Sequence, residues 1–285
     1  MQTQSIFASM TNIGWIGQPD LGQDFRFAWA SGDTGPRSEL RSGLPLEMAE
    51  AFVHEIEIAT DRGEDVFALP ISWIARGYGA LVSDMDSTLI KGESLDELAD
   101  ALGVGEQVAA ITARSMRGEL DFAEALSRRF DLIKGVPRQE FIRLGKTTRL
   151  STGAKFFIES LAKGGTICTL ATGGFDIIAE TIVVRLGMHD FVANALAFNP
   201  QGNFEGRLAA PILDADAKRK TLLARKSQAP QRLCLAMGDG ANDLAMIEAA
   251  DVGIAYRAKP IVRQATAFQL NHASFFDLPF LLGIT

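Results

Sequence analysis

Short apolar runs that alternate with helical segments constrain the fold of this chain more than any other feature of its sequence. The first run follows Tyr78 and reads GALVSDMD, which is typical of a buried parallel strand ending in acidic residues. Further strands are predicted at 166–172, 190–196, 232–237 and 252–255, helices at 153–163, 175–186, 216–226 and 242–250, and a hairpin at 197–208. This order predicts an α/β fold with a Rossmann-like parallel sheet and helices on both faces.

A long helical stretch separates the first two predicted strands. Ser94 precedes Glu97 by three residues, which is the spacing of a capping box at a helix start. Three more helices are predicted at 106–117, 121–133 and 138–145. The stretch is too long for a simple crossover between parallel strands. It is therefore predicted to be an inserted helical cap, at about residues 93–148, over one end of the sheet.

The first 75 residues differ from the rest. Residues 13–45 are rich in glycine and other turn-forming residues. Met48, Phe52 and Ile56 have helical spacing, but the stretch 54–59 alternates well enough to be a strand, so both assignments stay open. The prediction is a small N-terminal α+β appendage at 1–75, without a catalytic motif, attached to a core at 76–285.

Charge and composition exclude several classes of protein. The 285 residues carry a formal net charge of −7, so a basic nucleic-acid-binding surface is not expected. This charge also repels phosphate esters, so any site for them must gather cations or a metal. The start MQTQSIFASM is not a secretory signal, and no run of about 18 apolar residues exists to span a membrane. Cys168 and Cys234 lie in apolar runs and are expected to be reduced, which favours a cytoplasmic location. The sequence leaves a homodimer open.

The first candidate site is the segment Asp84-Met85-Asp86-Ser87-Thr88, which follows the first predicted strand. Ligands of open α/β sheets bind at the carboxyl ends of the strands. Two carboxylates brought together there need a cation or a shared proton, and Mg²⁺ is the natural partner of carboxylates and a phosphate. The competing interpretation is a solvated acidic loop.

Two further candidate sites follow later strands. Thr172-Gly173-Gly174-Phe175 places a hydroxyl and two glycines where a helix is predicted to open, an arrangement that binds phosphate; a plain strand-to-helix turn is the alternative. The segment 238–243, with the sequence GDGAND, offers Asp239, Asn242 and Asp243 for metal coordination. Its alternative is an ordinary Gly-Asp turn, in which Asp243 is favourable in the first helical turn.

A phosphoryl group also needs a cationic side chain, because its charge is spread over several oxygens. Lys218 and Lys220 begin the helix that precedes the third candidate site. Each of them has the alternative interpretation of a solvated surface lysine.

Together these segments resemble the haloacid dehalogenase superfamily of phosphotransferases. DMDST matches its first motif, Thr172 its second, Lys218 its third and GDGAND its acidic motif. The stretches DMDSTLIKGESLDELA, MRGELDFAEALSRR, ATGGF and GDGANDLAMIEAADVGIAYRAKP are similar in detail to the phosphoserine phosphatase family. The resemblance covers about residues 78–275 and does not extend to the N-terminal segment.

The resemblance implies roles for the acidic residues. Asp84 would be the nucleophile that becomes a phosphoaspartate, which splits one difficult displacement into two easier ones. Asp86 would be the general acid for the leaving oxygen and then the base for the hydrolytic water. Mg²⁺ would be held by the Asp84 carboxylate, the Asp86 backbone carbonyl and Asp239.

It also implies roles for the phosphate-binding and orienting residues. Thr172, the Gly173 N–H and Lys218 would bind the phosphoryl oxygens. Many members of the family have serine where this chain has Thr172, but the hydroxyl is kept. Asn242 and Asp243 would orient the site and its surroundings.

Substrate choice is expected to lie in the cap. By resemblance, Glu93 would receive the substrate ammonium and Arg129 would pair with its carboxylate, while Met116 and Phe122 would line the apolar side. The alternatives are a surface ion pair for Glu93 and Arg129 and core packing for Met116 and Phe122.

The implied function is hydrolysis of phosphoserine to serine and phosphate, the last step of serine biosynthesis. A phosphatase for another small phosphate, or a phosphotransferase to an alcohol such as homoserine, remains an alternative with the same chemistry. A non-catalytic ligand sensor is an alternative of another class, but the intact set of Asp84, Asp86, Lys218 and Asp239 argues against it.

Overall fold

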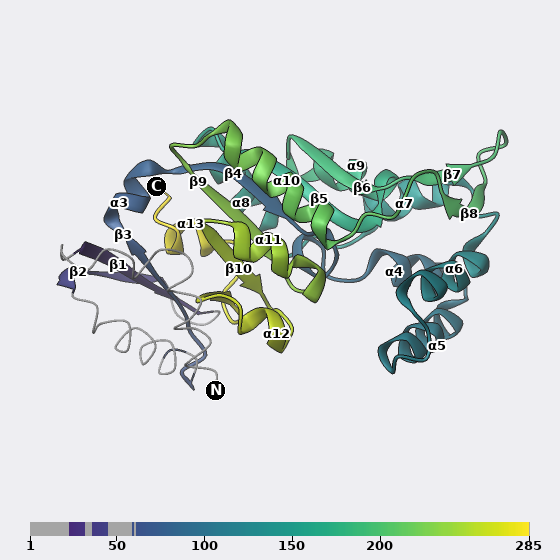
Figure 1. Ribbon diagram of the computed structural model, residues 1–285, viewed down its shortest axis with the longest axis horizontal. Coiled ribbons are helices and arrows are strands. Elements are labelled where there is room, and N and C mark those ends of the chain that lie inside the picture. Colours follow the sequence, from purple (N-terminus) through teal and green to yellow (C-terminus); the bar gives the residue numbers. More distant parts are fainter. Residues whose placement is uncertain (1–22, 32–35, 45–58, 60, 285) are drawn as a thin grey trace.

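A six-stranded parallel sheet forms the centre of the protein (Figure 1). The computed structural model describes residues 23–31, 36–44, 59 and 61–284. The strands follow the order β11-β10-β9-β4-β5-β6, with bounds β4 Tyr78–Ser83, β5 Ile167–Phe175, β6 Asp190–Asn194, β9 Leu233–Gly238, β10 Val252–Tyr256 and β11 Phe268–Leu270. All neighbours pair in parallel. The Rossmann-like α/β prediction is therefore confirmed, and only β11 lies outside the predicted strands.

Helices cover both faces of this sheet, which explains why its central strands β4, β9 and β10 are buried along their whole length. They are α8 Ala154–Lys163, α9 Asp176–Leu186, α10 Ala215–Gln228, α11 Leu244–Ala249, α12 Pro260–Arg263 and α13 Leu278–Leu281. Strand β4 shows the alternation: Leu81 packs in one core with residues of α8, α9 and α13, whereas Ala80 and Val82 pack in the other with residues of α10, α11 and α12. Burial on both faces fixes the register of the strand.

Four helices form the insertion between β4 and β5: α4 Ser94–Ala101, α5 Gly105–Met116, α6 Phe122–Ile133 and α7 Arg138–Thr147. Helices α4 to α6 stand apart from the sheet, while α7 contacts α9 (Figure 1). The two connecting segments run side by side, because Ile90 forms a bridge with Leu150 and the Lys91 N–H donates to the Arg149 carbonyl at 2.8 Å.

A hairpin of β7 Leu196–Phe198 and β8 Phe204–Leu208 supports the insertion from the core side. The Gly135 N–H, just beyond α6, donates to the Phe204 carbonyl at 2.8 Å. The Phe204 ring also meets the ring of Phe130 edge-on, with centroids 5.2 Å apart. The predicted hairpin is therefore present, and it packs on the base of the helical insertion.

An antiparallel sheet of order β2-β1-β3 lies at the end of the molecule opposite α4–α6 (Figure 1). Its strands are β1 Gln23–Ala30, β2 Arg37–Leu44 and β3 Asp65–Pro70, and helix α3 Ile71–Arg76 leads from β3 into β4. The sequence analysis assigns no strand to the turn-rich stretch 13–45, and in this respect it is wrong. The choice between helix and strand for 48–59 falls almost wholly outside the described residues.

The N-terminal sheet is joined to the C-terminal part of the core. The Asp65 carboxylate accepts hydrogen bonds from the backbone N–H groups of Asn271, His272 and Ala273, at 2.8–2.9 Å. Phe67 and Leu69 of β3 belong to the same apolar core as α13. Among the described helices, none combines the length and the hydropathy needed to cross a membrane.

Candidate active site

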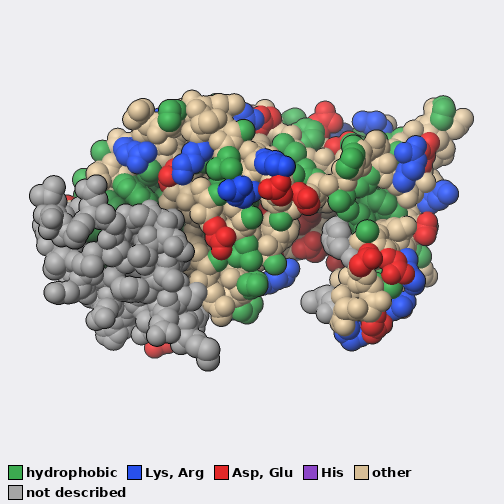
Figure 2. Space-filling view, viewed as in Figure 1, with side chains coloured by type: hydrophobic (Ala, Val, Ile, Leu, Met, Phe, Trp, Pro, Cys, Tyr) green, Lys and Arg blue, Asp and Glu red, His purple; other side chains and the backbone are tan. Residues whose placement is uncertain are grey.

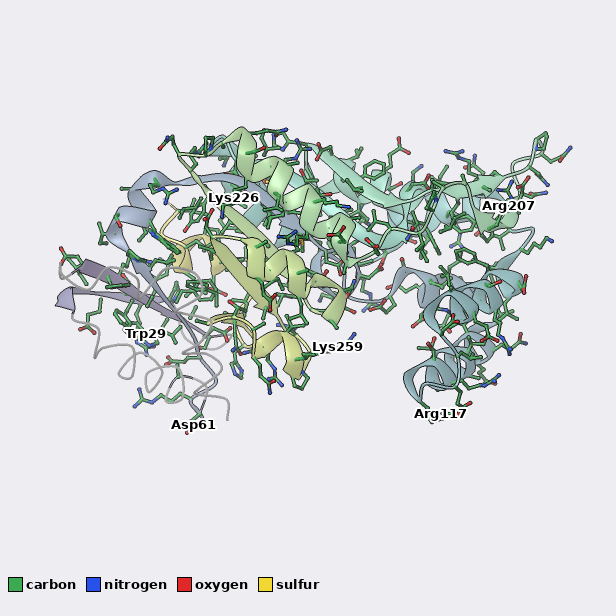
Figure 3. All side chains as sticks on the ribbon, in the orientation of Figure 1. Trp29, Asp61, Arg117, Arg207, Lys226 and Lys259 are labelled. Carbon is green, nitrogen blue, oxygen red and sulfur yellow. The ribbon has the colours of Figure 1, made fainter. Side chains whose placement is uncertain are left out.

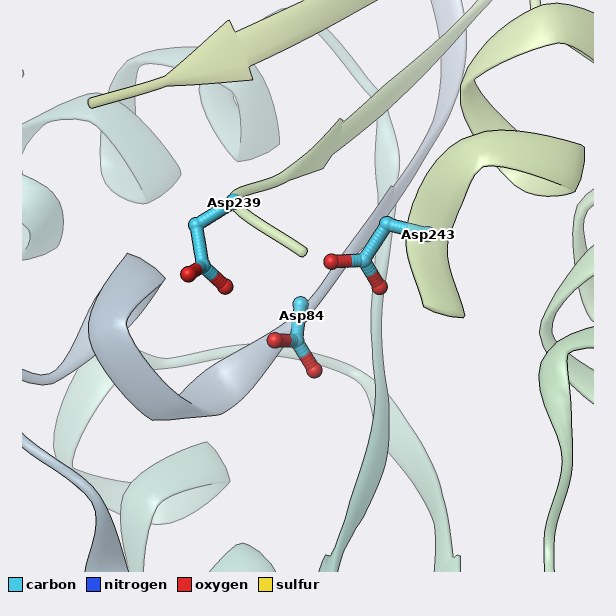
Figure 4. A group of neighbouring side chains, drawn as sticks. All are labelled: Asp84, Asp239 and Asp243. Atoms are coloured by element: carbon cyan, nitrogen blue, oxygen red, sulfur yellow. The ribbon is translucent and has the colours of Figure 1, made fainter. Parts of the chain in front are cut away.

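The candidate residues meet at the carboxyl ends of three adjacent strands. Asp84 directly follows β4, Thr172 lies near the end of β5, and Asp239 directly follows β9. Strand β4 lies between the other two in the sheet, so the three predicted segments reach one edge. Figure 4 shows Asp84, Asp239 and Asp243 turned toward one another. Each contributes a carboxylate oxygen to a group whose members lie within 4.8 Å of one another.

Lys218 is buried among these carboxylates. Its Nζ lies 2.6 Å from Asp84 Oδ1 and 2.7 Å from Asp243 Oδ1, and its side chain is 1% exposed. Burial alone would lower the pKa of Lys218, but the two carboxylates outweigh burial and raise it. The ammonium is therefore charged within the site. Lys220, the other candidate, pairs with Asp216 on the exposed face of α10, at 2.7 Å.

The Asp243 carboxylate binds the Lys218 side chain and also the backbone of the turn at Gly240. Its Oδ1 accepts from Lys218, and its Oδ2 accepts from the Gly240 N–H at 3.1 Å. A Cβ on Gly238 would come within 2.3 Å of Asp243 Oδ2, so this approach requires a glycine. Both Asp243 oxygens already accept hydrogen bonds. The carboxylate oxygens of Asp84 and Asp239 therefore have more lone pairs left to bind an ion.

The charges at this edge fit a divalent cation. Burial raises the pKa of Asp84, and the neighbouring Lys218 lowers it only in part. Burial also raises the pKa of Asp239, whose nearest cation is Lys259 Nζ, 4.0 Å from its Oδ2. Three carboxylates thus lie close together, with the buried ammonium bound to only two of them, and oxygen ligands of this kind are what Mg²⁺ and Ca²⁺ select. The Asp86 side chain is not a member of this group.

Asp86 points instead toward the start of the helical insertion. Its Oδ1 accepts from the Ser94 N–H at 2.7 Å. Burial, and after it the Glu93 carboxylate, raise the pKa of Asp86 to about 7. A Cβ on Gly174 would lie 2.9 Å from Asp86 Oδ2, so Gly174 gives this carboxyl its space. A carboxyl group with a pKa near neutrality can serve as both general acid and general base.

The Thr172–Phe175 segment differs from its predicted form. Strand β5 continues through Phe175 and α9 begins at Asp176, so the two glycines lie in extended backbone and not in the first turn of a helix. The Gly174 N–H donates to Thr172 Oγ1 at 2.8 Å. This bond uses one lone pair of the hydroxyl, whose proton can still be donated to a ligand. No atom lies within 4 Å of the position a Cβ would take on Gly173, so the space beside it is open.

Two polar residues that the sequence analysis does not single out hold this edge together. Asn194, at the end of β6, donates from Nδ2 to the Gly173 carbonyl at 2.7 Å. Ser87 has a φ of 54° and donates from Oγ to Glu93 Oε1 at 2.8 Å. A polar residue at the end of a predicted strand is the signal that could have found Asn194. Ser87 lies inside the first motif, but its bond to Glu93 depends on the turn.

The cap residues border an open cleft. Figure 2 shows a hollow between the core and the insertion, with acidic side chains on its wall. Glu93 is exposed at the start of α4. Arg129 of α6 is partly buried; burial lowers its pKa, and the carboxylates of Asp96 and Glu93 oppose that shift. Opposite charges thus lie near each other on α4 and α6.

Three other predicted residues are less informative. Met116 ends α5 and Phe122 begins α6, but their side chains are outside the described part of the structure. Asn242 is exposed in the turn Ala241–Asp243. Lys259, to which the sequence analysis gives no role, lies on the core side of the hollow (Figure 3). Its backbone N–H donates to the Asp239 carbonyl at 2.9 Å.

Comparison with known proteins points to one family. The family model of the haloacid dehalogenase-like hydrolases matches residues 81–248. Phosphoserine phosphatase SerB2 of Mycobacterium tuberculosis is 38% identical over 231 residues, which are 80% of this chain and 56% of the relative. The chain thus spans little more than half the length of that relative.

Solved structures agree with this match. A HAD family hydrolase from Salmonella enterica serovar Typhi superposes with a TM-score of 0.79 at 27% identity, covering 92% of this chain and 98% of the other. A phospho-aspartyl intermediate analogue of phosphoserine phosphatase has a TM-score of 0.63 at 31% identity, covering 72% of this chain and 99% of that one.

Proposed function

Because this chain belongs to the haloacid dehalogenase-like hydrolase family, we propose that it is a phosphatase that hydrolyses a phosphomonoester through an aspartyl phosphate on Asp84. The observation that carries the proposal is the buried Lys218 ammonium held between Asp84 and Asp243 at the sheet edge. A lysine there favours the ionised form of Asp84 and so opposes burial, which raises the pKa of that carboxyl. The solved phospho-aspartyl analogue of a similar protein supports the same nucleophile.

In the first step an Asp84 oxygen attacks phosphorus, and the bond from phosphorus to the ester oxygen breaks. Asp86 donates its proton to the departing oxygen, which leaves as an alcohol. Its raised pKa, about 7, keeps part of the population protonated at neutral pH. The hydrogen bond from Ser94 to Oδ1 fixes the carboxyl so that Oδ2 faces Gly174.

In the second step water attacks the phosphorus of the aspartyl phosphate. Asp86, now ionised, takes the water proton, the bond from Asp84 to phosphorus breaks, and inorganic phosphate leaves. The Thr172 hydroxyl, the Gly173 N–H and the Lys218 ammonium stabilise charge on the transferring phosphoryl oxygens. Asn242 and Asp243 orient the surroundings, and Asp243 does so through its bond to Lys218.

The proposal assigns Mg²⁺ to this site. The Asp84 and Asp239 carboxylates and the Asp86 backbone carbonyl would hold it. When bound, the ion neutralises negative charge between the nucleophile and the phosphate. The grouping of the Asp84, Asp239 and Asp243 carboxylates within 4.8 Å of one another supports a site for a divalent cation.

The substrate we propose is O-phospho-L-serine, with serine and phosphate as products. The reaction would then be the last step of serine biosynthesis. The relative from M. tuberculosis carries the name phosphoserine phosphatase. Glu93 and Arg129 would bind the substrate ammonium and carboxylate from the cap, and Met116 and Phe122 would line the apolar side. Another small phosphorylated metabolite is the alternative, since it requires the same residues of the core.

The domain organisation is part of the proposal. The catalytic core would span 76–285 with its cap at about 93–148, and 1–75 would carry no catalytic residue. The pairing of the two connecting segments at Lys91 and Arg149 supports an insertion that leaves and re-enters the core at one place. The two free, buried cysteines support a reducing compartment such as the cytoplasm. A homodimer remains compatible with the proposal.

A screen of phosphate release from small phosphorylated metabolites, with and without Mg²⁺, tests the proposal. We expect Mg²⁺-dependent turnover that is fastest with phosphoserine. Lys218→Met should abolish turnover, whereas Lys220→Met, two residues away on the exposed face, should not change it. Full activity in excess chelator, or full activity of Lys218→Met, would exclude the mechanism. A preference for a phosphate without an amino-acid end would exclude only the substrate assignment.

A further inference from the structure

Asn194 is a buried polar residue whose side chain joins two segments of the phosphate site. It lies at the end of β6 and is 4% exposed. A side-chain amide buried to this extent needs hydrogen-bond partners for its oxygen and its NH₂ group. The Nδ2 group donates to the Gly173 carbonyl at 2.7 Å. The Oδ1 atom accepts from the Leu213 N–H, also at 2.7 Å. Both ends of the amide are therefore committed to backbone groups.

The first of these bonds fixes the peptide that follows Gly173. The Gly173 carbonyl and the Gly174 N–H belong to the same planar peptide group. Asn194 holds that group at its oxygen, and Thr172 Oγ1 holds it at its N–H, 2.8 Å away. Rotation of this peptide would therefore break both bonds and release the Thr172 hydroxyl from its present direction.

The second bond reaches the start of α10. Leu213 directly precedes Asp214, whose side chain caps α10 by accepting from the Ala217 N–H at 2.9 Å. Lys218 lies in the first turns of this helix and projects its ammonium to Asp84. A shift of the Leu213 segment would thus move the helix that presents the lysine.

We propose that Asn194 is a positioning residue for phosphoryl transfer, which holds the Thr172–Gly173 segment and the Lys218 helix in register around the transferring group. The inference rests on the phosphatase chemistry proposed above, and it does not depend on phosphoserine being the substrate. Since hydroxyl, N–H and ammonium must converge on one phosphoryl group, small misplacements of any of them reduce the rate.

Asn194→Ala and Asn194→Asp test this role. The aspartate keeps an acceptor for Leu213 but loses the donor to Gly173, so it separates the two ends of the amide. For both variants we expect kcat to fall roughly 10- to 100-fold, the scale for misplaced catalytic groups, with little change in KM. Asn199→Ala is the matched control, because Asn199 Oδ1 binds only N–H groups of the hairpin turn, those of Gln201 and Asn203.

A second readout separates positioning from folding. Orthovanadate mimics the transferring phosphoryl group, whereas inorganic phosphate resembles the product. If Asn194 positions the site, its loss should weaken inhibition by vanadate more than inhibition by phosphate. A purely structural role would lower the melting temperature and leave the ratio of the two inhibition constants unchanged.

Assays with both phosphoserine and p-nitrophenyl phosphate keep this inference apart from the proposed function. An active wild-type protein combined with unchanged kcat in Asn194→Asp and Asn194→Ala would overturn the inference alone. A wild-type protein that hydrolyses neither substrate would remove the proposed function, and this inference with it. If the alanine variant does not fold, the aspartate variant, which matches asparagine in shape, decides the question.

Discussion

Asp65, where the N-terminal sheet meets the core, and Asp84, at the catalytic edge, are both buried, but their partners differ. Asp65 accepts three hydrogen bonds from successive backbone N–H groups, at residues 271–273. Asp84 shares the Lys218 ammonium with Asp243 and faces the Asp239 carboxylate as well. Backbone N–H groups bind the first carboxylate, whereas the second lies beside one ammonium and two further carboxylates.

The difference separates a structural carboxylate from a reactive one. Burial raises the pKa of Asp65 as well, but there three backbone donors that the fold itself supplies oppose the shift, and the residue joins two segments. At Asp84 the neighbouring carboxylates raise the local negative charge, and burial raises the pKa. Clustered buried carboxylates lower the stability of the fold and favour the binding of a cation. Such clusters are common at catalytic sites. The two residues should therefore respond to the same substitution in opposite ways.

The largest expected effect is the loss of turnover in Asp84→Asn. An amide of the same size is a poor nucleophile, so kcat should fall by on the order of 10⁶-fold, the scale for removing a catalytic nucleophile. Unfolding by urea without added metal should show a free energy equal to or above that of the wild type, because one of the clustered negative charges is gone. Beryllofluoride, a mimic of the aspartyl phosphate, should bind only the wild type. Undiminished turnover in this variant would rule out the covalent mechanism.

Asp65→Asn should have the opposite outcome. The amide oxygen can take the place of Oδ2 and keep the His272 and Ala273 N–H groups, which leaves the Asn271 N–H against the NH₂ group. The free energy of unfolding should fall by about 1–3 kcal/mol, the cost of one unsatisfied buried group. Turnover per folded molecule should stay unchanged. Asp61→Asn, at an exposed position nearby, should change the free energy of unfolding by less than about 0.5 kcal/mol. A loss of kcat without a loss of stability would contradict the structural role.

The contrast also shows how far the sequence predicts the structure. The segments around Asp84, Thr172 and Asp239 follow strands directly, so local order and residue chemistry predict the edge at which they meet. The partners of Asp65 and Asn194 are 206–208 and 19–21 residues away in the chain, and nothing local marks them. The predicted strand 166–172 is too short, because β5 continues past the two glycines to Phe175, an extension that the pairing of Phe175 with Asn194 stabilises.

The N-terminal strands are missed for a different reason. The sequence between 13 and 45 is rich in glycine, and this composition hides the alternating segment QDFRFAWA, which forms β1. Strand β3, with the sequence DVFALP, is buried along its whole length, because it packs on the core as well as on β1. The apolar sequence of β3 is explained by its packing against C-terminal residues of the core, which are distant in the sequence.

A smaller effect is expected at the cap, where residues select the substrate and leave the chemistry intact. Glu93→Gln and Arg129→Ala should each lower kcat/KM for phosphoserine roughly 10- to 150-fold, because a hydrogen bond to a charged group contributes on the order of 1.5–3 kcal/mol. The loss for an aryl phosphate without amino or carboxylate groups should be small. Arg128→Ala is the matched control, since Arg128 pairs with Glu124 on the exposed face of α6, at 2.7 Å. Equal losses on both substrates would make Glu93 and Arg129 structural.

The smallest expected effect is a shift in pH dependence that links the cap to the core. Burial and the Glu93 carboxylate raise the pKa of Asp86 to about 7, so Glu93→Gln should lower that pKa. The protonated acid is then lost at lower pH, and the alkaline limb of kcat/KM for phosphoserine should move to lower pH. For p-nitrophenyl phosphate the limb should barely move, because its leaving group needs no proton and kcat/KM reports only steps up to formation of the phosphoenzyme. An equal shift with both substrates, or a shift to higher pH, would show that Asp86 is not the acid for the seryl oxygen.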